Sequence, residues 1–415
     1  MKKKLTSILI IAMTVGMLAG CGKGDGPSSP VSDLDPKPYV PSESNPEGQD
    51  AVESSSDPEQ SQEPVVSLMS GGEKHPIGER VTVDGKMQSW LTGEWKDEDV
   101  VKRRNMAVMI NNIKVALPQY GISKASVIYE APVEGRITRL MGYFEDYDDL
   151  DRIGSVRSSR DYYVFESIAF DSIYCNWGLA QAWVEVLLKD NTYVDVDNIS
   201  EAVAGIYNPS SEAFGRVDRP GIAKEHTGYM FIDGYNEAVK RHGYKTEYRK
   251  TFVKAFEFAD EGYLATYDDC EDAVKIYPGG TQSNAGGYGK HNPCFTYNPE
   301  DRLYYRTQYG QEQIDEMNGE QLAVTNVIFK VCDGRRKEPN KPSSDYLEFD
   351  TVGKGDAYVF TNGKVIEGTW KRDDNSHYTK PTLYYDKDGN EIVLNQGKTW
   401  ICCIWSDYDQ YMKWE

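Results

Sequence analysis

The chain has 415 residues, and its 46 Lys and Arg against 66 Asp and Glu give a formal net charge of -20 and an isoelectric point near 4.8. That length exceeds what one hydrophobic core supports, and a hydrophobic content of 39% is enough for globular cores, so we expect two domains plus extra segments. The negative charge disfavours nucleic acid as a partner, because binding to phosphates requires a surface rich in Lys and Arg.

The N-terminal residues predict where in the cell the protein is located. Lys2, Lys3 and Lys4 precede an apolar stretch from Leu5 to Met17 that is too short to span a bilayer as a mature helix. This pattern is typical of a signal peptide over residues 1–20. The segment ends in Leu18-Ala19-Gly20-Cys21, which resembles the lipobox of bacterial lipoproteins, in which the Cys receives a diacylglyceryl group. We expect a lipid anchor on Cys21 that holds the protein at the extracytoplasmic face of the cell membrane; the alternative is an uncleaved anchor helix with a chance Cys.

Residues 21–75 are expected to form a disordered tether. After Cys21 this segment contains eight of the 19 prolines, eleven serines, eleven acidic residues and three lysines, with almost no aliphatic periodicity. Such a composition cannot bury enough apolar surface to offset the entropy of ordering. The tether would let the folded part stand off the membrane and sample the wall layer.

Residues 76–250 show the pattern of a mixed α/β domain. Short apolar runs predict strands at Met106–Ile110, Ser126–Tyr129, Leu140–Phe144, Ser172–Cys175 and Gly228–Ile232. Helical periodicity predicts helices at Asp161–Phe170, Leu179–Leu188 and Tyr235–Arg241, the last closing on Gly243.

Residues 251–415 show the pattern of a β-rich domain, so the expected fold class is α+β. Strands are predicted at Val324–Phe329, Ala357–Phe360, Val365–Ile366, Thr382–Tyr385, Ile392–Leu394 and Thr399–Trp405. Asn362-Gly363 and Asp388-Gly389 have the composition of hairpin turns, and Gly279 to Gly289 is expected to be a mobile loop.

The cysteines that remain after Cys21 indicate neither a metal site nor a disulfide framework. Their spacings contain no Cys-x-x-Cys pair. Cys175 and Cys332 lie in apolar runs typical of a core, and Cys402 and Cys403 would point to opposite faces of a strand. The chain also contains no Gly-x-Ser-x-Gly, P-loop or His-Glu-x-x-His motif, so no cofactor is expected.

Several motifs, in order, resemble those of the YerB-like lipoproteins. They are Arg104–Asn112, Pro118–Gly121, Ile128–Ala131, Glu134–Arg139, Ile153–Arg160, Gly353–Tyr358, Gly368–Arg372 and Gly397–Ile401. The resemblance runs from about residue 90 to the end of the chain and implies a bacterial lipoprotein with an N-terminal and a C-terminal domain. The family's function is unknown, so the resemblance transfers no catalytic residue. Asn176 stands where many relatives have His, which weakens a general-base role for that position.

The first candidate site is the run Ser155–Asp161 before an apolar helix. Ser158 is expected to cap that helix, so that its N-terminus and the charges of Arg157 and Arg160 favour an anion. In the alternative interpretation, the two arginines pair with Glu130, Glu134 or Asp161 and hold the loop.

The second candidate group is Glu130, Glu134, Arg136 and Arg139. Two carboxylates at the correct separation can serve as acid and base in glycoside cleavage. Acids beside bases more often neutralise one another, so a structural role is the other interpretation.

Two further residues complete the candidate set for ligand binding. His226 precedes a predicted strand and could act as an acid or base, or simply hydrogen-bond to the backbone. Asn112 ends the first family motif. We therefore expect a lipoprotein that binds a wall polymer, an anionic ligand or an envelope protein through an Arg/Glu-rich cleft. The alternative is a hydrolase or transferase that acts on cell-wall polymer with Glu130 and Glu134, so the sequence leaves open whether the protein is an enzyme.

Overall fold

The structure is a computed structural model that describes residues 81–178, 183–184, 187, 202–204, 213–281, 288–337, 346–373 and 378–415. The expected signal peptide, Cys21 and the tether lie outside the described residues, as do most of the helix expected at Leu179–Leu188 and the centre of the loop expected at Gly279–Gly289. Within the described part, no helix is long and apolar enough to cross a membrane.

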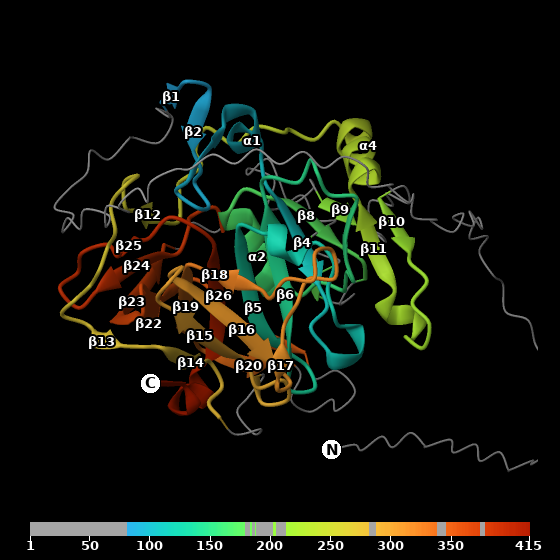
Figure 1. Cartoon of the computed structure of the whole chain (residues 1–415). Coiled ribbons are helices and arrows are strands. Elements are labelled where there is room, and N and C mark those ends of the chain that lie inside the picture. The colour runs from blue at the N-terminus through green and yellow to red at the C-terminus, as the bar shows by residue number, and fades with distance from the viewer. Residues whose placement is uncertain are drawn as a thin grey trace, which may run out of the picture. The chain divides into compact units, whose positions relative to one another are not determined.

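A mixed eleven-stranded sheet combines strands from both halves of the body (Figure 1). Its order is β13 (Glu271–Asp272), β23 (Lys364–Arg372), β22 (Gly353–Thr361), β19 (Asn326–Cys332), β26 (Thr399–Trp405), β5 (Val127–Val133), β6 (Ile137–Phe144), β4 (Met106–Ile110), β8 (Ile173–Asn176) and β9 (Ala202–Ala204), with β24 (Leu383–Asp386) paired to β23. The two halves meet where β26 pairs in parallel with β5, with Ile401 opposite Tyr129.

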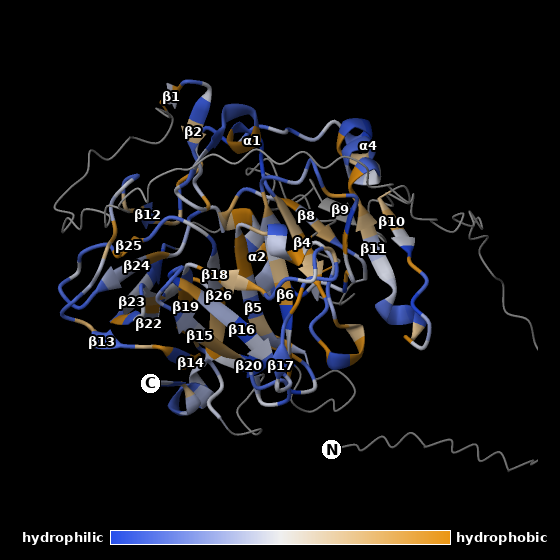
Figure 2. Ribbon diagram, viewed as in Figure 1, coloured by the Kyte–Doolittle hydropathy of each residue, from blue (hydrophilic) through white to orange (hydrophobic). Residues whose placement is uncertain are grey.

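The central strands are apolar because both faces of the sheet are covered. In β5, Val127 and Tyr129 lie in one buried cluster and Ile128 lies in the other. Helix α2 (Asp161–Ala169) packs in the first cluster. Figure 2 shows these strands and α2 as largely hydrophobic.

A six-stranded sheet covers the second face. Its order is β17 (Gln311–Glu312), β16 (Leu303–Gln308), β15 (Cys294–Asn298), β14 (Lys275–Tyr277) and β27 (Lys413–Trp414), with β18 (Ala323–Val324) also paired to β16. Phe295 of this sheet packs edge-on against Trp400 of β26, with ring centroids 5.5 Å apart. The space between the two sheets is therefore a core shared by the two halves of the chain.

The remaining elements lie around these two sheets. They are β1 (Thr82–Val83), β2 (Lys86–Gln88), β3 (Trp95–Asp97), α1 (Glu98–Lys102), β7 (Arg152–Gly154), β10 (Phe214–Arg216), β11 (Gly228–Phe231), α4 (Ile232–His242), β12 (Glu257–Phe258), β20 (Gly334–Arg336), β21 (Leu347–Phe349) and β25 (Val393–Leu394), with short 3-10 turns at Lys114–Ala116, Ile122–Lys124, Lys224–His226 and Ser406–Tyr411. Gly243 ends α4 in a left-handed conformation, as expected.

The α+β expectation agrees with the structure in its coarse form, since strands dominate and helices are few among the described residues. Residues Asn362 and Gly363 form the predicted hairpin turn with positive φ values of 50° and 72°. All six described cysteines are free; Cys175 and Cys332 are buried, and Cys402 and Cys403 enter opposite core clusters. The expectation that Ser158 caps α2 is wrong: the residue at the cap is Arg160, and no side chain caps the helix.

Candidate functional site

Glu130 lies at the centre of a buried polar network. Strand β5 directs it toward the six-stranded sheet, where its carboxylate is completely buried. Arg306 Nη2 lies 2.9 Å from Oε2, His291 Nε2 donates to Oε1 at 2.9 Å, and Trp400 Nε1 donates to Oε2 at 3.0 Å. All three partners belong to the C-terminal half.

The N-terminal half supplies the remaining partners of Glu130. Thr138 on β6 donates from Oγ1 at 2.6 Å, and Asn112 donates from Nδ2 at 3.3 Å. Burial alone would raise the pKa of Glu130, but the charge of Arg306 and the hydrogen bonds from His291 and Thr138 outweigh it and lower the pKa to about 2. The carboxylate therefore stays charged and can hold the two halves together, whereas a general acid would need a raised pKa and access to substrate.

Two buried glutamines, Gln313 and Gln119, extend this network. Arg306 Nε donates to Gln313 Oε1 at 2.6 Å, and Gln313 Nε2 donates to Gln119 Oε1 at 3.1 Å. Gln119 in turn donates to the backbone carbonyl of Asn111 at 3.0 Å. The contact with Gln313 and the ion pair with Glu130 together hold the guanidinium of Arg306 in place.

A second group, which we name the arginine cluster, consists of Arg139, Arg157 and Arg160. Arg139 projects from β6, while the other two lie on the segment between β7 and α2. Arg139 Nη1 donates to the carbonyl of Ser158 at 2.5 Å, and Arg157 Nη1 donates to the carbonyl of Glu225 at 3.2 Å. Only Arg160 forms a close two-pronged ion pair, in which Nε lies 2.9 Å from Glu134 Oε1 and Nη2 also contacts the carboxylate.

The three guanidinium groups repel one another. Burial lowers the pKa of Arg139 to about 10, and the charges of Arg160 and Arg157 add to that effect. Burial also lowers the pKa of Arg157, although the more distant Glu225 carboxylate, 3.9 Å away, opposes this. Burial lowers the pKa of Arg160 as well, but its pair with Glu134 more than compensates and the pKa is raised. Positive charge thus exceeds negative charge at this point of an acidic protein.

Two buried polar atoms near the cluster have no hydrogen-bond partner among the described residues. They are Nε of Arg157 and Oγ of Ser155. The N-terminus of α2 does not add to an anion site, because Asp161 occupies its first turn and pairs with Lys337.

His226 lies next to the arginine cluster. Asn111 Nδ2 donates to its Nδ1 at 3.1 Å, and its Nε2 lies 3.2 Å from a carboxylate oxygen of Glu225. Burial and then the charge of Arg157 lower the pKa of His226, so the ring is neutral near pH 7. It can therefore position Glu225 and Asn111.

The structure separates the residues singled out by sequence into two groups. Asn112 and Glu130 belong to the buried network. The second group is the arginine cluster itself with its neighbours Glu134, Ser158 and His226. Arg136 lies in the turn between β5 and β6, with φ of 61°. The described residues contain no group of three or more His, Cys, Asp and Glu that could hold a metal ion.

Sequence reasoning missed Arg306 and His291, the main partners of Glu130. Arg306 occupies a buried position of β16, and the other buried positions are Tyr304 and Gln308. The sequence of this strand therefore does not alternate between apolar and polar residues, and no pattern marks Arg306 as buried. Glu166 of α2 was missed similarly: it pairs with Lys330 at 2.9 Å and with Arg372 at 3.2 Å inside the core.

Comparison with known proteins identifies the family. Residues 91–245 match the N-terminal domain, and residues 285–401 the C-terminal domain, of a protein family of unknown function, DUF3048. The chain is 28% identical over 334 residues to the Bacillus subtilis (strain 168) protein YerB, named as a candidate lipoprotein; the match covers 76% of this chain and 86% of that protein. The chain belongs to the YerB-like family.

The fold agrees with this assignment. The crystal structure of YerB from Bacillus subtilis matches with a TM-score of 0.63 and 25% sequence identity, covering 79% of this chain and 98% of the YerB chain. Both domains of the family therefore occur in this YerB-like chain, which confirms the resemblance noted in the sequence.

Proposed function

We propose that this YerB-like protein is a lipoprotein, anchored through Cys21 at the extracytoplasmic face of the cell membrane, that binds an anionic component of the cell envelope at the arginine cluster. The lipobox-like run before Cys21 and the name of the relative support the anchor. The cluster supports the binding role.

One observation carries the binding proposal: three arginines lie within electrostatic reach of one another, and only Arg160 has a close carboxylate partner. A net charge of -20 would repel an anion elsewhere on the molecule. An anion at the cluster would relieve the repulsion that lowers the pKa of Arg139, and guanidinium groups bind carboxylate and phosphate oxygens in pairs.

The described geometry gives less support to hydrolysis of wall polymer. Glu130 is buried and ion-paired to Arg306, and the pKa of Glu134 is lowered because hydrogen bonding and charge from Arg160 outweigh its burial. Neither carboxylate has the raised pKa of a general acid that protonates a leaving group.

Titration of the purified body, residues 76–415, with pyrophosphate and with an anionic wall polymer tests the binding role. We expect affinity that falls steeply between low and physiological salt, because the contacts are ionic. The double variant Arg157→Ala, Arg160→Ala should weaken binding at least tenfold. Arg335→Ala is the matched control, since that arginine is exposed and paired with Glu348 and Asp350. Equal binding by the double variant and the wild type would refute the proposal, and loss of folding would show that the arginines are structural.

Fractionation of cells tests the anchor. Wild-type protein should partition into detergent and incorporate labelled fatty acid, whereas Cys21→Ala should remain uncleaved or be shed without label. Identical maturation and partitioning of the two forms would exclude the lipobox interpretation. The binding result and the anchoring result are independent of each other.

A further inference from the structure

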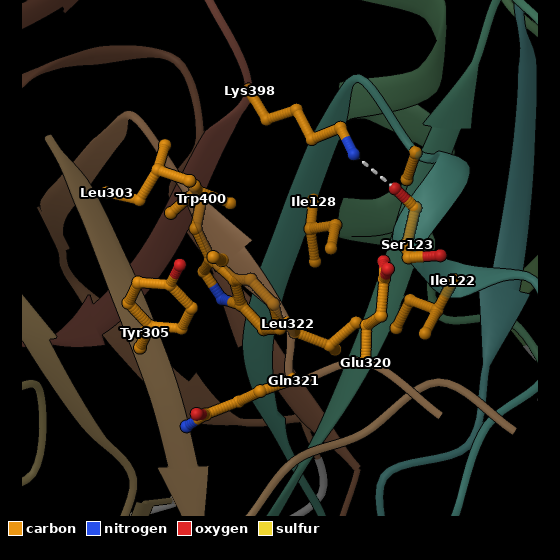
Figure 3. A pocket seen from close by; sticks show the side chains of 13 residues that line it. Ile122, Ser123, Ile128, Leu303, Tyr305, Glu320, Gln321, Leu322, Lys398 and Trp400 are labelled. Atoms are coloured by element: carbon orange, nitrogen blue, oxygen red, sulfur yellow. Dashed lines mark hydrogen bonds between the residues drawn. The ribbon is translucent and has the colours of Figure 1, made fainter. Parts of the chain in front are cut away.

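A pocket of about 470 Å³ lies at one edge of the space between the two sheets (Figure 3). No residue of the arginine cluster lines it, and segments from both halves of the chain build it. Residues 122–128 form one side, β16 and the segment leading into β18 form the other, and the start of β26 closes it. Its volume falls in the range of small-molecule sites.

Several of the side chains that line the pocket are apolar and buried. Ile128, Leu322 and Trp400 line it and are at most 4% exposed. Two contacts orient the indole of Trp400: Nε1 donates to Glu130, and the guanidinium carbon of Arg306 lies 4.2 Å from the ring centroid. The buried network therefore holds one wall of the pocket in place.

Among the described residues that line the pocket, Lys398 is the one cationic side chain. Its backbone carbonyl accepts hydrogen bonds from the N–H groups of Thr325 and Asn326, both at 3.0 Å, which fixes the start of β26. Its Nζ donates to the backbone carbonyl of Ser123, as Figure 3 shows. Among the described residues no carboxylate forms an ion pair with this ammonium, which leaves further N–H donors for a ligand.

We propose that this pocket binds a small amphipathic carboxylate, with its apolar body against Leu322 and Trp400 and its carboxylate on Lys398. Burial lowers the pKa of Lys398. The charges of Glu94 and Asp315 oppose this shift and those of Lys96 and Lys124 add to it, so the pKa stays lowered and a bound anion would stabilise the charged amine. A phosphate dianion fits less well, because the rim offers one lysine and no arginine, and Glu320 lines the same pocket. This inference does not depend on the proposed function, which concerns other residues.

Calorimetric titration of residues 76–415 with 3-phenylpropionate and its neutral analogue 3-phenylpropanamide tests the proposal. The carboxylate should bind at least tenfold more tightly than the amide at neutral pH and low salt. The preference should shrink as the pH rises through the lowered pKa of Lys398. Absence of saturable carboxylate binding, or equal affinity for both compounds, would overturn the proposal.

Amino-acid substitutions test whether these compounds bind in the pocket beside Lys398. Lys398→Met keeps the aliphatic chain and should lose the preference for the carboxylate, whereas Lys387→Met, which removes an exposed lysine paired with Glu367, should not. Ala323→Phe should fill the pocket and abolish binding of both compounds. Arg157→Ala with Arg160→Ala should leave 3-phenylpropionate binding unchanged, which separates this pocket from the arginine cluster. Unchanged preference in Lys398→Met, or unchanged binding in Ala323→Phe, would refute the assignment.

Discussion

At the scale of the residue, Glu130 remains ionised in the interior because side chains from both halves of the chain converge on it. A buried charge is costly unless it is paired and fully hydrogen-bonded, and Arg306, His291 and Trp400 supply most of that compensation. The sequence indicated that Glu130 could be a structural acid beside arginines. It could not indicate Arg306, which lies 176 residues away and is brought near only by the packing of two sheets.

Glu130→Gln should destabilise the protein by about 3 kcal/mol at pH 7, because it leaves Arg306 buried without a counter-charge. The folded-state pKa of Glu130 is about 2, below its ordinary value of 4.5, so its contribution is present above the ordinary value and disappears as the pH falls toward 2. The difference between wild type and variant should therefore shrink over that interval. Urea unfolding at a series of pH values measures it.

Glu134→Gln is the matched control for this measurement. Glu134 also pairs with an arginine, but the side chains of this pair are 22% and 10% exposed, against 0% and 1% for Glu130 and Arg306, so water reaches the pair in part. A smaller loss is expected. A loss at position 134 as large as that at position 130 would contradict the importance given to burial.

At the scale of the element, apolar runs identified the central strands because these strands are covered on both faces. The same reasoning failed for β14, β15 and β16. In β16 the buried residues are Tyr304, Arg306 and Gln308. Because these side chains carry polar groups, the strand lacks the alternation of apolar and polar residues by which a strand is recognised in a sequence. For the same reason the candidate site could be predicted only in part. Sequence analysis singled out residues on or beside apolar strands, such as Glu130, but not their partners on polar strands, such as Arg306.

Hairpin glycines offer a test at this scale. Gly363 has φ of 72°, and a Cβ there would lie 2.8 Å from the ring of Tyr297, whose hydroxyl donates to Asn362 at 3.0 Å. Gly363→Ala should therefore combine backbone strain of about 1 kcal/mol with a steric clash and lower the melting temperature clearly. Gly389→Ala is the control, because Gly389 has φ of 85° but open space around its Cα, so only the strain applies. Equal effects at both positions would show that contact with Tyr297 is unimportant.

At the scale of the whole molecule, the two family domains share one sheet. The parallel pairing of β26 with β5 runs from Thr399 opposite Val127 to Cys402 opposite Glu130. Sequence patterns predict a change from a mixed region to a β-rich region. They contain no information on which strands become neighbours across the boundary, since parallel pairing of distant segments depends on the packing of both faces.

Separating the halves should therefore prevent folding of each. Alone, residues 76–250 would expose the edge of β5 and the apolar face that the six-stranded sheet covers, and residues 251–415 would expose the edge of β26. We expect neither fragment to show a cooperative thermal transition by circular dichroism, and a mixture of both to recover one. The control is the intact body with a protease site inserted between Lys250 and Thr251, both exposed, and cleaved after folding; it should stay associated and keep its transition. A sharp transition in either isolated fragment would show that its domain has a self-sufficient core, and the shared sheet would then be a docking interface between two independently stable domains.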